Sequence, residues 1–149
     1  MANFSPAVNT RGMIYTHQGG IVLRSTYYVF ELYNRMQNNY IDTWNPGEED
    51  EMLDLAVTAD DTSSKISISV VNKDHRNSKT VSFTVDRCLT DLEMYTVNGP
   101  DTDSCNTTDK TEVLIRKGIV RQSPDQRTVT AILEPHSVNV ITMQLSIHL

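Results

Sequence analysis

The stretch that decides the fold is "LDLAVTADDTSSKISISVVNKDHRNSKTVSFTV", residues 53–85. Three runs within it, 53–59, 66–71 and 81–85, alternate apolar and polar side chains. Successive side chains of an extended strand point to opposite faces, so alternation places one face against a core and the other in water. The separators "DDTSSK" and "NKDHRNSK" are polar turn segments typical of links between antiparallel neighbours. The stretch therefore predicts three antiparallel β-strands.

The same pattern continues to the C-terminus. Further short strands are predicted at residues 92–98, 113–117, 119–122, 129–133 and 138–145. The last run changes phase between Val140 and Ile141, which predicts a bulge or burial on both sides of the strand. Seven or eight short strands with regular turns indicate an all-β sandwich over residues 50–149.

One helix is predicted, from Tyr27 to Tyr40. Its apolar residues recur at intervals of three and four, the spacing of one helix face: Val29, Leu32, Tyr33, Met36 and Tyr40. Ser25 or Thr26 can supply an oxygen that caps the first free amides. The pieces before this helix, 12–15 and 21–23, are too short to form a core for it.

The helix and the strands are separated by "DTWNPGEEDEM", residues 42–52. Turn-forming residues followed by four acids predict a linker or an exposed loop. Trp44 lies in this loop, soon after Tyr40, and has two interpretations. It either fills the joint between helix and sandwich, as large aromatics at such joints usually do, or stacks on a sugar ring.

Charge and composition exclude several classes of function. A net charge of −6 and a pI near 5.1 disfavour nucleic acid and anionic membranes as main partners. No apolar run approaches the roughly 20 residues of a membrane span, and no compartment is indicated.

Cys88 and Cys105 can pair or remain free thiols. They lack His or Cys companions at metal-ligand spacing, so neither a metal site nor a cofactor is expected.

Catalytic motifs are not evident either. The four histidines, which occupy turns or strand ends, are His17, His75, His136 and His148. No nucleophile elbow, phosphate-binding loop or dinucleotide fingerprint occurs. The acids at 48–51 could be imagined as a calcium or acid–base cluster, but contiguous acids in a Pro-Gly loop are more often a solvated run.

Four segments in order carry a resemblance to a known family. They are "ANFSPAVNTRGMIYTHQGGIVLRSTYYVFELY" (2–33), "ISISVVNKDHRNSKTVSFTV" (66–85), "VNGPDTDSCNTTDKTEV" (97–113) and "LEPHSVNVITMQL" (133–145). They resemble the C-terminal part of α-L-arabinofuranosidases of glycoside hydrolase family 51. In that family they are the end of the catalytic barrel, a sandwich hairpin, a long connection and the closing strand.

The resemblance implies a mainly β fold: an antiparallel, jelly-roll-like β-sandwich with an N-terminal strand–helix remnant of a (β/α)8 barrel. Residues 1–42 would be the remnant and 43–149 the sandwich domain. A whole barrel needs about 250 residues, so the rest would lie upstream of Met1. A first run without acids until Glu31 suits a barrel strand shielded on both faces.

The activity implied is retaining hydrolysis of terminal arabinofuranosyl groups from arabinan or arabinoxylan by the parent enzyme. That reaction uses two carboxyl groups about 5 Å apart, both glutamates on earlier barrel strands in the family. No catalytic residue is therefore expected in this chain. Pro6 replaces a family glutamine that reaches the sugar. Asn9 and Arg11 follow near the catalytic end of the strand and are candidates for lining the pocket or, alternatively, for holding the turn.

Three functional hypotheses follow. The chain is an accessory domain that braces an upstream catalytic barrel, with an arabinose-containing glycan reaching it through the parent enzyme. Alternatively, it is a free-standing carbohydrate-binding module that uses Trp44 and Tyr40. The third follows from the first: residues 1–40 expose apolar surface and mediate homo-oligomers.

Overall fold

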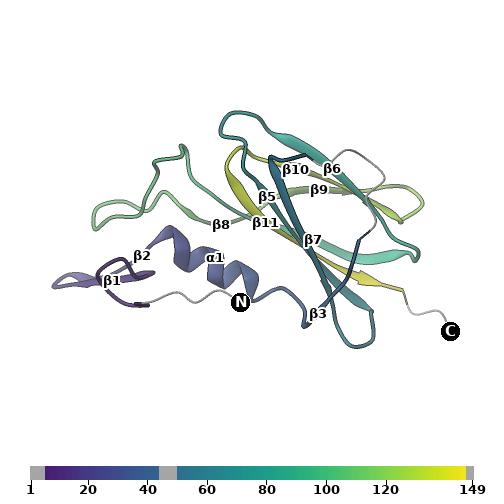
Figure 1. The fold of residues 1–149 in the computed structure, drawn as a ribbon, viewed down its shortest axis with the longest axis horizontal. Helices are drawn as coiled ribbons and strands as arrows, with labels where there is room; N and C mark the ends of the chain where they lie inside the picture. The colour runs from purple at the N-terminus through teal and green to yellow at the C-terminus, as the bar shows by residue number, and fades with distance from the viewer. Residues whose placement is uncertain (1–5, 44–49, 147–149) are drawn as a thin grey trace.

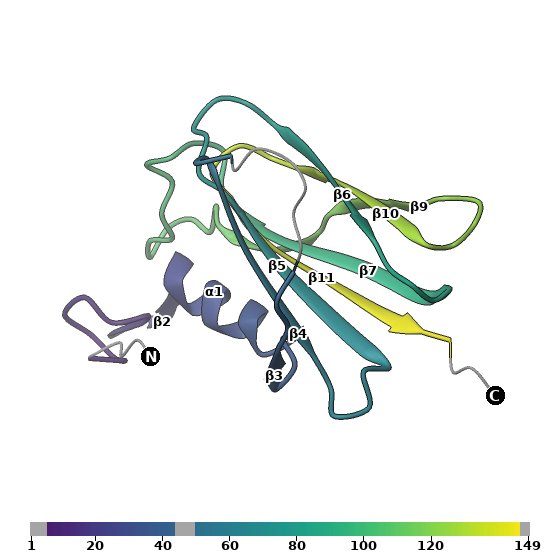
Figure 2. The same ribbon diagram turned by 45° about the vertical axis from the view of Figure 1, so that its right-hand side comes forward.

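The computed structural model describes residues 6–43 and 50–146 and contains two antiparallel sheets packed face to face (Figures 1 and 2). The larger sheet has six strands in the order β3 (Asn39–Tyr40), β4 (Leu53–Ala59), β5 (Lys65–Asn72), β11 (Ser137–Leu145), β7 (Leu89–Asn98), β8 (Leu114–Lys117). The smaller has three, in the order β6 (Lys79–Thr84), β10 (Thr128–Leu133), β9 (Ile119–Gln122). The predicted mainly β sandwich is confirmed, with sheets of unequal size.

The main core lies between the two sheets. In the central strand of the smaller sheet, Val129, Ala131 and Leu133 are all fully buried. They face apolar side chains from the inner face of the six-stranded sheet, including Val57, Ile68, Val70, Met94, Ile141 and Met143. Burial of this apolar surface is the main term that stabilises such a sandwich.

Strand β11 is buried on both faces, which explains the phase change in its sequence. Val140 and Ile141 are both 0% exposed, although they point to opposite sides. The register against β7 also shifts between Met143 and Leu145. Two-sided burial therefore explains the phase change at Val140 and Ile141, while the irregularity in pairing lies further along the strand.

The second face of β11 is covered by α1 (Ser25–Tyr33) (Figure 2). Leu32 is fully buried there against Val97, Val113 and Val140. The flanking side chains that are partly buried in this second core include Tyr28, Val29, Met36, Tyr95, Ile115 and Val138. The predicted apolar face of the helix is thus confirmed for Val29 and Leu32, and Met36 packs on the same core from the turn after the helix.

The helix is shorter than predicted. It ends at Tyr33, the bonds Arg35 N to Leu32 O and Met36 N to Tyr33 O tighten the following turn, and Tyr40 belongs to β3. After this turn, the amide of Gln37 donates to Thr58 Oγ1 on β4. The capping prediction was wrong, since Arg24 occupies the cap position without a side-chain cap bond. With nine residues, this one helix of the described chain falls far short of a membrane span.

Before the helix, β1 (Ile14–His17) and β2 (Gly20–Leu23) form a hairpin that the sequence did not predict (Figure 1). Each strand has only four residues, and the sequence showed only the short apolar pieces 12–15 and 21–23 there. Their antiparallel register pairs Tyr15 with Val22 and His17 with Gly20. The hairpin lies beside α1, away from the smaller sheet.

Two interpretations of β5 need correction. Ser67 and Ser69, expected on a wet face, are 0% and 2% exposed because the C-terminal end of α1 and the turn after it cover them. The segment "NKDHRNSK" does not join neighbouring strands, since β5 and β6 belong to different sheets. The resemblance to a sandwich hairpin was therefore wrong on this point, although Asn72 does end β5.

The crossing from β8 to β9, which lie in different sheets, needs a glycine. Gly118 is the single residue between the two strands, and its amide donates to Met94 O. A Cβ there would lie 2.7 Å from Met94 Cγ and 2.8 Å from Thr96 Oγ1. The close approach explains why a side chain is excluded.

Of the two cysteines, Cys88 is half-buried, Cys105 is exposed, and both are free thiols.

Candidate functional site

The loop before the hairpin contains the candidates Asn9 and Arg11. Asn9 and Thr10 have positive φ angles, 57° and 47°, a conformation that Asn tolerates better than most residues. Asn9 Oδ1 accepts hydrogen bonds from the amide and the hydroxyl of Thr16, at 2.8 and 2.9 Å. The Asn9 side chain therefore holds the loop against β1, while the Arg11 side chain is exposed.

Arg24 closes this loop, and the sequence reasoning missed it. Its Nη1 donates to the carbonyl oxygens of Thr10 at 3.0 Å and Gly12 at 3.2 Å. The guanidinium carbon also lies 5.5 Å from the centre of the Tyr15 ring, within the range of a cation–π contact. In the sequence, Arg24 was marked only by its position next to the start of a predicted helix. Arginine occurs at such positions for many other reasons.

On the same face of β1, the rings of Tyr15 and His17 are nearly parallel. Their centres are 5.9 Å apart and their planes differ by 10°. Tyr15 remains 38% exposed. Arg24, Tyr15 and His17 thus form a row on the hairpin, which we call the hairpin row. Residues i and i+2 of a strand share a face, so the "YTH" triplet could have indicated the pair had β1 been predicted.

Asn106 joins the hairpin to the sandwich. It lies in the long connection between β7 and β8 and is only 7% exposed. Its Nδ2 donates to Leu23 O of β2 at 2.8 Å and to Val113 O at 2.7 Å. Its Oδ1 accepts from the amides of Glu112 and Val113. One side chain therefore fixes both the long connection and the end of the hairpin.

The end of α1 is joined to the sheet by polar contacts. Ser67 Oγ donates to Arg35 O at 2.8 Å, and Ser69 Oγ donates to Tyr33 Oη at 2.9 Å. The Arg35 guanidinium carbon lies 3.9 Å from the centre of the Tyr95 ring. Together with Leu32, these contacts hold helix and sandwich together as one unit.

The N-terminal segment also presents apolar side chains to solvent. Val8 is 47% exposed, Ile21 64% and Phe30 47%. Soluble proteins tolerate single exposed apolar residues, but a concentration of them in one short segment is typical of an interaction surface. We call residues 6–33 the N-terminal face.

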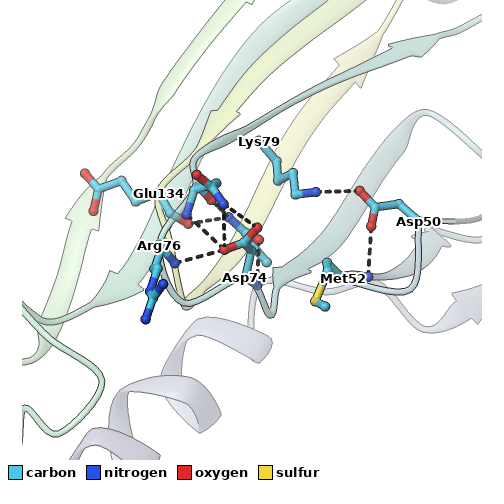
Figure 3. A network of polar contacts seen from close by, with 8 residues as sticks. Asp50, Met52, Asp74, Arg76, Lys79 and Glu134 are labelled. Atoms are coloured by element: carbon cyan, nitrogen blue, oxygen red, sulfur yellow. Dashed lines mark hydrogen bonds and ion pairs between the residues drawn. The ribbon is translucent and has the colours of Figure 1, made fainter.

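The two carboxylates with the most strongly shifted pKa values, Asp74 and Asp60, have structural tasks, and Figure 3 draws the bonds of Asp74. Asp74 Oδ1 accepts bonds from the amides of Arg76 and Asn77, both at 2.9 Å, and these bonds lower its pKa to about 2. Hydrogen bonds from Lys65, Thr62 and Ser64 likewise lower the pKa of Asp60 well below its usual range. A carboxylate that stays ionised in this way is poorly suited to donate a proton near neutral pH.

Within the described part of the acidic run 48–51, Asp50 forms an ion pair with Lys79. Asp50 Oδ2 lies 2.9 Å from Lys79 Nζ, and Asp50 Oδ1 accepts from the amide of Met52 (Figure 3). An open depression of about 630 Å³ lies beside this network, lined by Met52, Asp74, His75, Arg76, Asp101 and Thr102. Trp44, Glu48 and Glu49 lie outside the described residues. Within the described ranges, no group of three or more His, Cys, Asp or Glu side chains could hold a metal ion.

Comparison with known families identifies the architecture. The family model described as the α-L-arabinofuranosidase C-terminal domain matches residues 1–137. The chain belongs to this family. The predicted relationship to arabinofuranosidases of glycoside hydrolase family 51 is confirmed. No curated protein matches the sequence.

Solved structures of arabinofuranosidases show the same fold as this α-L-arabinofuranosidase C-terminal domain. The enzyme from Thermotoga maritima in complex with arabinose superposes with a TM-score of 0.81 at 24% identity over 95% of this chain. The family 51 enzyme from Xanthomonas axonopodis pv. citri gives 0.81 at 25% identity over 97%. A family 30 xylanase from Talaromyces cellulolyticus gives 0.66 at 14% identity over 94%, a likeness of fold alone.

This chain spans only about a third of the length of these proteins. It covers 33% of the Thermotoga maritima chain and 31% of the Xanthomonas chain. It corresponds to a C-terminal portion of such enzymes.

Proposed function

We propose that this domain supports the catalytic barrel of a parent α-L-arabinofuranosidase that removes terminal arabinofuranosyl groups from arabinan or arabinoxylan with retention of configuration. The observation that carries the proposal is the match to the C-terminal domain family over residues 1–137. Two of the neighbours of known structure are arabinofuranosidases about three times as long as this chain. In this proposal the catalytic glutamates belong to the upstream barrel.

The N-terminal face supplies the contact with that barrel. In this proposal, residues 1–42 belong to the last strand and helix of the barrel, and residues 43–149 form the sandwich domain. One side of α1 packs on the sandwich through Leu32, and the other side carries Phe30 toward the remainder of the barrel. Because α1 is bound to the sandwich so firmly, the sandwich braces the barrel through it.

Asn9 and Arg11 have different tasks in this proposal. Asn9 shapes the turn, because its side-chain oxygen is bonded to Thr16. Arg11, which is exposed, lines the rim of the sugar pocket at the catalytic end of the strand.

The test is a hybrid enzyme in which this chain replaces the matching C-terminal third of the Thermotoga maritima arabinofuranosidase. We expect hydrolysis of p-nitrophenyl α-L-arabinofuranoside and one cooperative melting transition. A second hybrid with Leu32→Ala should melt at a lower temperature, because the helix then loses its hold on the sandwich. A soluble hybrid with two separate transitions and no turnover would refute the bracing role.

The alternative function, a free-standing carbohydrate-binding module, has one observation in its favour. Tyr40 on the edge strand β3 is 68% exposed, and its ring could stack on a sugar. This reading predicts glycan binding that disappears in both Tyr40→Ala and Trp44→Ala. Binding that survives both substitutions would exclude it.

A further inference from the structure

We propose that the hairpin row of Arg24, Tyr15 and His17 is a binding site for a pentose ring of the glycan. The inference rests on the proposed function, because it places the hairpin at the catalytic face of the barrel. Residues 9–24 lie between the last barrel strand and its helix α1 in that proposal. Loops in this position form the catalytic face of every such barrel.

The geometry of the row suits a sugar. Tyr15 is 38% exposed and His17 is half-buried, so part of each side chain is open to solvent although Arg24 lies over the Tyr15 ring. Aromatic rings beside polar groups recognise sugars because the C–H groups of a sugar pack on the ring while its hydroxyls form hydrogen bonds.

The row also has a hydrogen-bond donor of defined position. His17 Nδ1 accepts a bond from the amide of Gly19 at 3.2 Å. A neutral imidazole that accepts at Nδ1 carries its proton at Nε2, which therefore donates to a sugar hydroxyl. Gly20, the cross-strand partner of His17, has open space where a side chain would be. The ligand can therefore approach His17 from this side.

The row is held rigidly at its Arg24 end. Arg24 is fixed by its bonds to Thr10 O and Gly12 O, and the neighbouring Leu23 O is bound by the buried Asn106. Rigid support reduces the entropy lost on binding. It also connects the sandwich to the substrate, because Asn106 belongs to the long connection between β7 and β8.

The experiment titrates the 149-residue chain with α-1,5-L-arabinotriose and follows backbone amide and aromatic ring signals by NMR. We expect shifts at Tyr15, at His17 and along β1 and β2. Tyr15→Ala should weaken binding roughly three- to tenfold, the loss expected for one aromatic contact. Tyr15→Phe, which keeps the ring, should bind within about twofold of the original chain. Signals of the sandwich report whether each variant is folded.

Ile119→Ala is the control, because it removes an exposed apolar side chain, 55%, from the smaller sheet. It should leave the affinity unchanged. Shifts centred on β3, unchanged affinity in Tyr15→Ala, or no hairpin shifts through the millimolar range would each overturn the proposal. The hybrid enzyme separates the two hypotheses: an active hybrid without hairpin shifts leaves the proposed function intact and refutes only the hairpin site.

Discussion

At the scale of single residues, Asp74 shapes the loop that carries the chain from one sheet to the other. Its carboxylate accepts bonds from two backbone amides and from Asn77 Nδ2, while its own amide donates to Asn72 Oδ1 (Figure 3). Asn72 in turn donates to Asn77 O and Glu134 O. The loop therefore depends on an ionised carboxylate.

Acid should weaken this loop. The pKa of Asp74 is about 2 in the folded chain against 3.8 for an ordinary aspartate. A lowered folded-state pKa means that its stabilisation is fully present above about pH 4 and is lost as the pH falls toward 2. Asp74→Asn should lower the melting temperature at neutral pH, and its difference from the original chain should shrink toward pH 2.

The measurement is the melting temperature of both chains across this pH range. Asp54→Asn serves as the control, since Asp54 forms only an exposed ion pair with Lys73. It should melt close to the original chain at neutral pH. A constant difference between the Asp74→Asn variant and the original chain at every pH would contradict the role of the charge.

Asn106 is the second residue with a large expected effect. Asn106→Ala removes four hydrogen bonds, two of them to buried backbone groups of Val113 and one to the carbonyl oxygen of Leu23. We expect a loss of about 2–4 kcal/mol in the free energy of unfolding, measured by urea denaturation. Asn39→Ala, which removes one exposed bond to Asp61, should cost less than about 1 kcal/mol. Equal losses in the two variants would show that Asn106 does not join hairpin and sandwich.

At the scale of elements, the strands were the most predictable part of the fold. The bounds predicted for β4 and β9 agree with the structure, because each strand has its own alternation or turn signals. The pairing was less predictable. Nothing local in the segment after Asn72 distinguishes a turn between neighbours from a crossing between sheets.

Contacts between segments far apart in the sequence were the part of the fold that could not be predicted. In the sequence, Ser67 and Ser69 have the alternation of solvent-facing residues. In the structure, the end of α1 and the turn after it cover them. The hairpin row was missed for a different reason, since β1 and β2 lie in short apolar pieces that the sequence reasoning did not assign to strands. Of the candidate site, the sequence supplied Asn9 and Arg11 but neither Arg24 nor Asn106.

The packing of α1 makes a prediction at this scale. Leu32→Ala should destabilise the chain by about 2–5 kcal/mol, because Leu32 is fully buried in the second core. Hydrogen exchange should show that protection is lost first in residues 25–33. Ile21→Ala, at a side chain that is 64% exposed, should cost less than about 1 kcal/mol. Unchanged protection of the helix in Leu32→Ala would contradict the assigned packing.

At the scale of the whole molecule, the N-terminal face should drive self-association when no barrel covers it. We expect the mass measured by light scattering to rise with concentration. Ile21→Asp should suppress this rise, because a charge in an apolar contact is costly. Ile119→Asp changes a similarly exposed residue, 55%, on the smaller sheet and should have no effect. A mass independent of concentration in the original chain would contradict the prediction.

The central claim is that this domain supports chemistry performed by residues outside it. The most direct measurement is the hydrolysis of p-nitrophenyl α-L-arabinofuranoside by the purified chain, beside an intact family 51 arabinofuranosidase under the same conditions. The account predicts no turnover by the chain and rapid release of p-nitrophenol by the intact enzyme. Turnover by the chain at a rate comparable to that of the intact enzyme would contradict it, because a carboxylate pair within these 149 residues would then have to perform the reaction.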